Sequence, residues 1–275
     1  RAGLQVHPLM HLKITHETHY LYDQPVDYAL QKVRLRPLDN PLQTIADWTV
    51  EVEGGKIETS YRDHYGNHTD LVSITPETHN LIIRAHGTVD TVDGAAGVLG
   101  PVYGRAPLWH FTQPTPLTAP GDGVAALASV LATATDALTG LHDLSAAILG
   151  VTPYQIGKTA ADTTAETALG IGAGVCQDHA NIFVAAARVA GLPARYVSGY
   201  LMMNDRIDQD ASHAWAEAHV PDLGWVGFDI SNGYAPDERY ARIAVGRDSA
   251  DAAPISGMRM GSAGESLIVS LQVQQ

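Results

Sequence analysis

The chain has 275 residues, which is enough for one large domain or two of ordinary size. Hydrophobic residues make up 45% of it and charged residues 17%, a composition typical of a soluble globular protein and not of a disordered one. The formal net charge of -13, from 17 Lys and Arg against 30 Asp and Glu, disfavours binding to nucleic acid or to anionic membranes.

Cysteine usage and the first residues bear on the cellular compartment. The chain holds 1 cysteine, so it forms no intrachain disulfide, and residues 1–9 lack the apolar core of a signal peptide. No uncharged apolar stretch reaches the roughly 18 residues that a membrane helix needs. We therefore expect a cytoplasmic protein. Met10 has the character of a natural start, which would leave residues 1–9 outside the native chain.

The first third of the chain has the pattern of short β-strands. From Leu12 to Tyr22, apolar or aromatic residues alternate with polar ones, as in a half-buried strand. Further strand patterns recur between Gly and Pro turn signals, which favours an antiparallel sandwich or barrel. These patterns cover residues 32–36, 48–53, 71–74 and 81–91.

Residues 94–123 are dense in Gly and Pro and mark the expected boundary between two domains. Beyond them the pattern becomes helical, in residues 124–134 and again in residues 141–149. A third helix is predicted from Cys176 to about Ala190, after the glycines at 170, 172 and 174. Strand patterns then follow at residues 194–200, 212–220, 225–230 and 266–273.

The single cysteine stands where a thiol would be reactive. Cys176 is expected at a helix N-terminus, whose unpaired N–H groups and positive dipole end favour the thiolate. The same N–H groups can receive the oxyanion that forms when a carbonyl is attacked. His213 and Asp229 follow Cys176 along the chain. The three residues thus have the order of a nucleophile, its base and the residue that orients the base.

The turn between two strands decides whether His213 and Asp229 can meet. They lie on successive predicted strands joined by Pro221 to Gly224. A loop of three or five residues puts both side chains on one sheet face, whereas a four-residue loop puts them on opposite faces. Taken singly, each residue also has an ordinary explanation. Cys176 could be an inert buried thiol, His213 a packed histidine and Asp229 a turn former. Their conjunction favours catalysis.

Four segments together resemble the bacterial transglutaminase-like family. They are Gly174-Val175-Cys176-Gln177-Asp178-His179-Ala180, residues 192–200, Ser212-His213-Ala214-Trp215 and residues 224–229. The resemblance extends over nearly the whole chain, since residues 12–22, Val33-Arg34-Leu35-Arg36-Pro37 and residues 61–67 resemble that family's N-terminal β-region. It implies a papain-like triad of Cys176, His213 and Asp229.

The resemblance also implies supporting residues and shows two departures. Tyr154 is the best match for an aromatic residue that shapes the site, and Gln177 and Trp215 are the other expected substrate or oxyanion-supporting residues. His179 replaces a usual Phe, and we expect it to be packed. Asp229-Ile230-Ser231-Asn232 replaces the commoner Asp-Pro-Thr-Asn.

The resulting expectation is an α+β protein. Residues 10–100 would form an N-terminal antiparallel, sandwich-like β-domain, and residues 101–275 a papain-like transglutaminase core of helices packed on an antiparallel sheet. The expected activity is hydrolysis of a peptide or amide through a thioacyl intermediate, with a peptide or protein as acyl donor and no metal or organic cofactor. Transamidation and a non-catalytic scaffold role are the alternatives, and the oligomeric state stays open.

Overall fold

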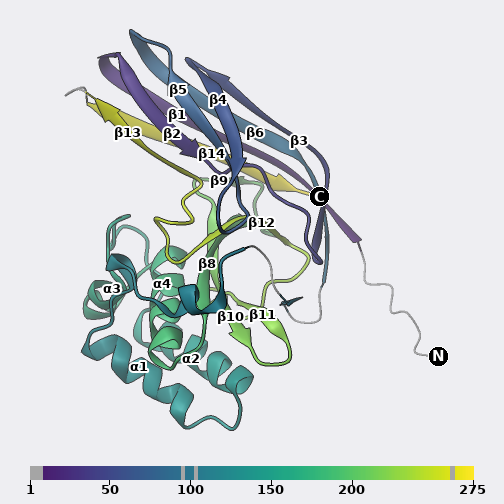
Figure 1. Ribbon diagram of the computed structural model, residues 1–275, viewed down its shortest axis with the longest axis vertical. Coiled ribbons are helices and arrows are strands. Elements are labelled where there is room, and N and C mark those ends of the chain that lie inside the picture. Colours follow the sequence, from purple (N-terminus) through teal and green to yellow (C-terminus); the bar gives the residue numbers. More distant parts are fainter. Residues whose placement is uncertain (1–8, 94–96, 102–104, 261–263) are drawn as a thin grey trace.

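The computed structural model describes residues 9–93, 97–101, 105–260 and 264–275 (Figure 1). Residues 1–8, on which the expectation of a start at Met10 depends, lie outside the described residues, as do parts of the Gly-rich boundary segment. One lobe of Figure 1 is built of long strands, and the other holds the helices together with a shorter sheet. The chain is therefore an α+β protein with a β-rich N-terminal part.

The β-lobe consists of two antiparallel sheets. Buried side chains alternate along β1 from Leu12 to Tyr22, as the sequence pattern predicts, and face a core shared by both sheets. The first sheet has the order β3 (Gln43–Glu53), β6 (Thr78–Val92), β1 (Leu9–Val26), β14 (Glu265–Gln274) and β9 (Asp208–Gln209). The second has the order β13 (Ile255–Met260), β2 (Tyr28–Val33), β5 (His68–Ile74) and β4 (Gly55–Arg62).

The last two strands belong to this lobe, which differs from the expected division at residue 100. β14 pairs with β1 over ten residues, from Gln274 opposite Lys13 to Glu265 opposite Tyr22. β13 pairs with β2 from Ile255 to Met260. Conversely, β7 (Val98–Gly100) pairs with a strand of the other lobe. Sequence order alone therefore misplaces both ends of the expected second domain, because strand pairing joins segments far apart in the chain.

The second lobe places helices against an antiparallel sheet. Its sheet has the order β12 (Tyr240–Gly246), β8 (Ala194–Leu201), β10 (His213–Val220), β11 (Gly224–Phe228) and β7. Helix α4 (Cys176–Val189) is buried along most of its length and contacts β10 and β8. Around it lie α1 (Asp122–Ala132), α2 (Ala137–Val151), α3 (Ala165–Ile171) and the short helices η1 (Leu108–Thr112) and η2 (Pro116–Thr118). No helix in the described residues is long and apolar enough to cross a membrane.

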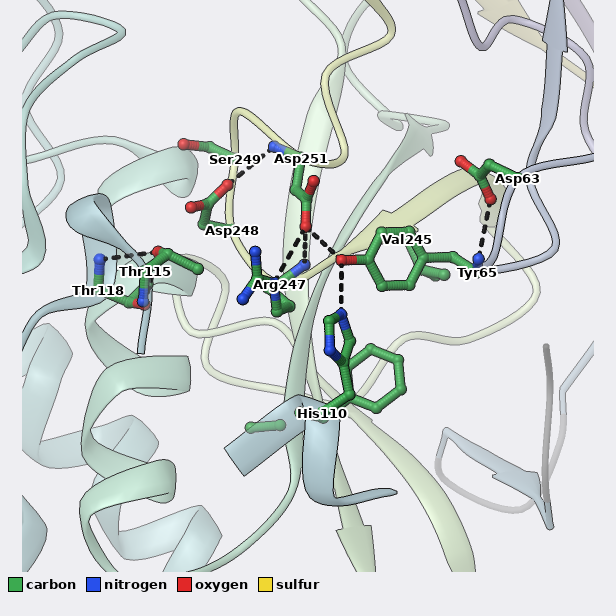
Figure 2. Close-up of polar contacts among 12 residues, drawn as sticks. Asp63, Tyr65, His110, Thr115, Thr118, Val245, Arg247, Asp248, Ser249 and Asp251 are labelled. Atoms are coloured by element: carbon green, nitrogen blue, oxygen red, sulfur yellow. Dashed lines mark hydrogen bonds and ion pairs between the residues drawn. The ribbon is translucent and has the colours of Figure 1, made fainter. Parts of the chain in front are cut away.

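A turn of the β-lobe is anchored in the second lobe (Figure 2). Tyr65 is 2% exposed. Its hydroxyl donates to the Asp251 carboxylate and lies 3.2 Å from Nε2 of His110. Two residues on, the Asn67 side chain donates to the Val245 carbonyl at 2.8 Å and accepts from the Val245 N–H at 2.9 Å. These buried bonds fix one lobe against the other.

Candidate active site

A capping network holds Cys176 in the first turn of α4. Oδ2 of Asp178 accepts hydrogen bonds from the N–H of Val175 at 2.8 Å and from Oγ1 of Thr159 at 2.6 Å. A Cβ at position 174 would lie 2.8 Å from Cβ of Asp178, so this close approach requires Gly174. The carboxylate thereby fixes the start of the helix at Cys176, as the sequence predicts.

The Cys176 side chain is half-buried and packs against the core of the second lobe. The N–H groups of a first helical turn have no intrahelical acceptor, so those of residues 176–178 lie where an oxyanion could bind. The side chain of Gln177 is engaged elsewhere, because its Nε2 lies 3.3 Å from the carbonyl oxygens of Ala160 and Ala161. Of Gln177, only the backbone N–H is therefore placed to support an oxyanion.

The hairpin between β10 and β11 has the register that a Cys-His-Asp site needs. Val220 pairs with Gly224, which leaves a three-residue loop, and Ala216 pairs with Phe228. Asp222 (φ 65°) and Gly224 (φ 82°) occupy the left-handed region that this tight turn requires. One residue past β11, Asp229 therefore falls on the same sheet face as His213. The loop length that the sequence left open is three.

Asp229 and His213 form a buried ion pair. Nε2 of His213 donates to Oδ2 of Asp229 at 2.6 Å, with His213 8% exposed and Asp229 0% exposed. Tyr240 donates its hydroxyl to the same oxygen at 2.6 Å. Asn232 donates its side-chain amide to Oδ2 at 2.7 Å and its backbone N–H to Oδ1 at 3.1 Å. The carboxylate is thus held by four donors and cannot rotate away from the imidazole.

The other side of the imidazole meets the thiol. Burial by itself lowers the pKa of His213, but hydrogen bonds with Asp229 and Cys176, together with the charges of both, outweigh it and raise the pKa to about 10. Since Nε2 is bonded to Asp229, Nδ1 is the nitrogen left to face the sulfur. Burial likewise opposes ionisation of Asp229, and the bonds from His213, Tyr240 and Asn232 reverse that effect and lower its pKa.

The sequence did not predict Tyr240, and its role depends on packing around the imidazole. Its ring lies 5.9 Å from that of His213 and edge-on to Trp215, with 5.4 Å between centroids. Trp215 itself is 2% exposed and stacks beside His213 at 6.4 Å. Its Nε1 has no partner among the described residues. Trp215 therefore packs against the imidazole from the protein interior. It does not line the open cavity beside His213.

Tyr154 and His179 lie next to one another near the start of α4, with 6.1 Å between their ring centroids. Tyr154 forms a β-bridge with Gly174 and is 49% exposed, so its side chain reaches the surface beside the site. His179 is buried, with Nε2 donating to the Thr152 carbonyl at 2.7 Å and Nδ1 2.8 Å from Oγ of Ser231. Burial lowers its pKa, so it is neutral and accepts from Ser231. His179 is a packed, fully bonded residue, as expected.

The arrangement can supply a nucleophile, a base and an orienter without a metal. Among residues 9–93, 97–101, 105–260 and 264–275, no group of three or more His, Cys, Asp or Glu is arranged to hold a metal ion. The geometry fits attack of a thiolate on a carbonyl carbon, with proton transfer through His213.

Two regions of the chain match the models of known protein families. Residues 12–90 match the model of the bacterial transglutaminase-like N-terminal region, and residues 125–230 match that of the transglutaminase-like superfamily. An uncharacterized protein of Mycobacterium tuberculosis is 30% identical, with 90% of this chain and 86% of the relative covered. One of Mycobacterium leprae is 27% identical over 95% and 98% of the two chains.

The fold has a counterpart among solved structures. A protein of Cytophaga hutchinsonii, named as a candidate cysteine protease, superposes with a TM-score of 0.77 at 24% identity. The match covers 98% of this chain and 92% of that one. The likeness therefore includes the β-lobe as well as the helical lobe.

Proposed function

Because the chain belongs to the transglutaminase-like superfamily, we propose that it is a cysteine-dependent acyl-transfer enzyme that hydrolyses peptide or amide bonds. The observation that carries the proposal is the buried pair of His213 and Asp229, with the imidazole bonded to the thiol of Cys176 at the start of α4. A protein that acts only as a scaffold has no need for a thiol, an imidazole and a carboxylate in contact with one another. The proposal thus includes papain-like chemistry for the core, with a thiolate as nucleophile and an imidazolium as acid.

The first half-reaction forms a thioester. The Cys176 thiolate attacks the amide carbonyl carbon, and the oxygen becomes an oxyanion near the N–H groups of the first helical turn. The imidazolium of His213 gives its proton to the leaving nitrogen as the C–N bond breaks. Asp229 keeps the proton on Nε2 in place throughout, so the ring acts through Nδ1.

The second half-reaction releases the acyl group. Neutral His213 takes a proton from water, the resulting hydroxide attacks the thioester carbonyl, and the C–S bond breaks to regenerate thiolate and imidazolium. If an amine takes the place of water, the same steps give transamidation. We favour water because it is the acceptor that needs no binding site of its own.

The test is alkylation of Cys176 by iodoacetamide as a function of pH. We expect fast alkylation near neutral pH in the wild type and a much slower rate in His213→Ala. His219→Ala is the matched control, since His219 lies on the same strand with its ring against Trp225. A wild-type thiol no more reactive than free cysteine, or equal rates in the two variants, would leave a scaffold protein.

The products identify the acceptor. Incubation with casein and a fluorescent primary amine separates the two enzymatic outcomes, because hydrolysis yields new peptides and transamidation yields labelled casein. We expect new peptides, absent in Cys176→Ala. Labelled casein without new peptides would reassign the protein as a transglutaminase.

A further inference from the structure

A cavity of about 610 Å³ opens directly beside His213. Segment 154–156, which runs beside Gly174, forms one wall, and the end of β8 with the following loop forms the other. The cavity therefore reaches the imidazole of His213, whereas Cys176 is not among the residues that line it.

Large apolar side chains are exposed around this cavity. Ile156 is 81% exposed, Tyr154 49% and Tyr234 39%. The thioethers of Met202 and Met203 add a flexible, polarisable surface on the other wall. Apolar side chains gathered at a concave site beside reactive groups are typical of ligand binding, because water held there is released when an apolar ligand enters.

The charged groups of the cavity already have partners. Arg239 makes a two-pronged ion pair with Asp237 and lies over the ring of Tyr234 at 5.2 Å. Arg206 pairs with its neighbour Asp205 at 3.3 Å. Each guanidinium group faces a carboxylate of the chain itself, which weakens the attraction of the cavity for a charged substrate side chain.

We propose that this cavity binds a bulky apolar side chain, aromatic or long aliphatic, of the acyl donor. The inference rests on the proposed function and names its substrate class. The side chain belongs at the residue that carries the attacked carbonyl or immediately before it. The acyl part stays bound through both half-reactions, whereas the leaving amine departs and gives its place to the acceptor. A walled cavity therefore suits the acyl part.

The experiment uses acetyl-dipeptide chloromethyl ketones. The Cys176 sulfur displaces chloride from the methylene carbon, which leaves a stable thioether that mass spectrometry locates. Either position of the dipeptide carries Phe, Leu, Ala, Glu or Lys, with Ala at the other. Each rate is divided by the iodoacetamide rate of the same protein, so that recognition is separated from thiol reactivity.

We expect the Phe or Leu probe to react at least about tenfold faster than the Ala probe at one of the two positions. In Ile156→Asp this preference should fall several-fold, because a carboxylate at the exposed wall disfavours an apolar group. Ile268→Asp is the matched control on β14, where Ile268 is 54% exposed, and it should keep the wild-type preference.

The outcomes separate the two proposals. Equal rates for Phe, Leu and Ala, or a faster rate for Glu or Lys, would overturn the apolar subsite while a thiol reactive toward iodoacetamide leaves the acyl-transfer function standing. An Ile156→Asp protein that keeps the full preference would also overturn it. A wild-type thiol unreactive toward iodoacetamide removes the proposed function, and the subsite with it.

Discussion

Replacing Asp229 by Asn tests the buried ion pair most directly. The substitution keeps the shape of the side chain and removes its charge. In the wild type the pKa of His213 is about 10, compared with an ordinary value of 6.5, although burial alone lowers it. Without the carboxylate, burial is opposed only by Cys176. We expect the pKa of His213 to fall by about 2 to 3 in Asp229→Asn, which is the effect of one close opposite charge.

The stability of the protein should follow the same ionisation. A difference between 6.5 and about 10 corresponds to about 5 kcal/mol at 1.36 kcal/mol per pH unit. Because the folded pKa of His213 is the higher one, this stabilisation is complete below pH 6.5 and is lost as the pH rises toward 10. The expected fall of about 2 to 3 in the pKa is the share of Asp229, so Asp229→Asn should lower the free energy of unfolding by roughly 3 to 4 kcal/mol at pH 6, with a smaller loss at pH 9.

Two measurements check this prediction. The ¹³C shift of the His213 ring between pH 5 and 11 gives its pKa, and urea unfolding at pH 6 and pH 9 gives the stability. Asp222→Asn is the control, because Asp222 is exposed in the hairpin turn at a φ of 65° that Asn readily adopts. If His213 in Asp229→Asn titrates within one pH unit of the wild-type value, the carboxylate does not hold the imidazolium.

Three further substitutions probe the supporting structure. Tyr240→Phe removes one hydrogen-bond donor from Asp229. It should lower the free energy of unfolding in urea by about 1 to 3 kcal/mol and slow the alkylation of the thiol. An unchanged alkylation rate would mean that Tyr240 acts only through packing. Gly174→Ala brings a methyl group within 3 Å of the Asp178 side chain and should lower the free energy of unfolding by about 1 to 3 kcal/mol. A melting temperature equal to that of the wild type would count against the capping network. Tyr65→Phe removes the buried hydroxyl that joins the lobes and should cost about 1 to 3 kcal/mol by thermal unfolding at pH 7. An unchanged melting temperature would mean that this hydroxyl does not stabilise the contact between the lobes.

Local sequence patterns predicted the elements whose signal is periodic. The alternation from Leu12 to Tyr22 matches the buried face of β1, and the helical spacing after Cys176 matches α4 to within one residue of its end. For the three proposed catalytic residues, the sequence predicted the helix start and the two strands. It left the hairpin loop open, because three, four and five residues are all compatible with the turn signals there.

The elements that were missed take their stability from distant contacts. α3 spans only Ala165–Ile171, and its Glu166 carboxylate accepts from the N–H groups of Gly121, Gly123 and Val124 at the start of α1. Strand β4 is exposed on nearly all its residues and so lacks alternation. Tyr240 lies in β12, on the far side of β8 from His213, where no spacing along the chain relates it to Asp229.

The placement of β13 and β14 has a consequence for biosynthesis. A ribosome delivers β1 and β2 first, and N-terminal domains commonly fold before the rest of a chain is made. Here β5 and β6 follow early, but the second partner of each strand, β14 for β1 and β13 for β2, emerges more than two hundred residues later, after the helical lobe. Until then those strand edges stay open and able to pair with other nascent chains. A premature stop codon after residue 254 would make that exposure permanent and leave the helical lobe attached to an aggregation-prone β-lobe.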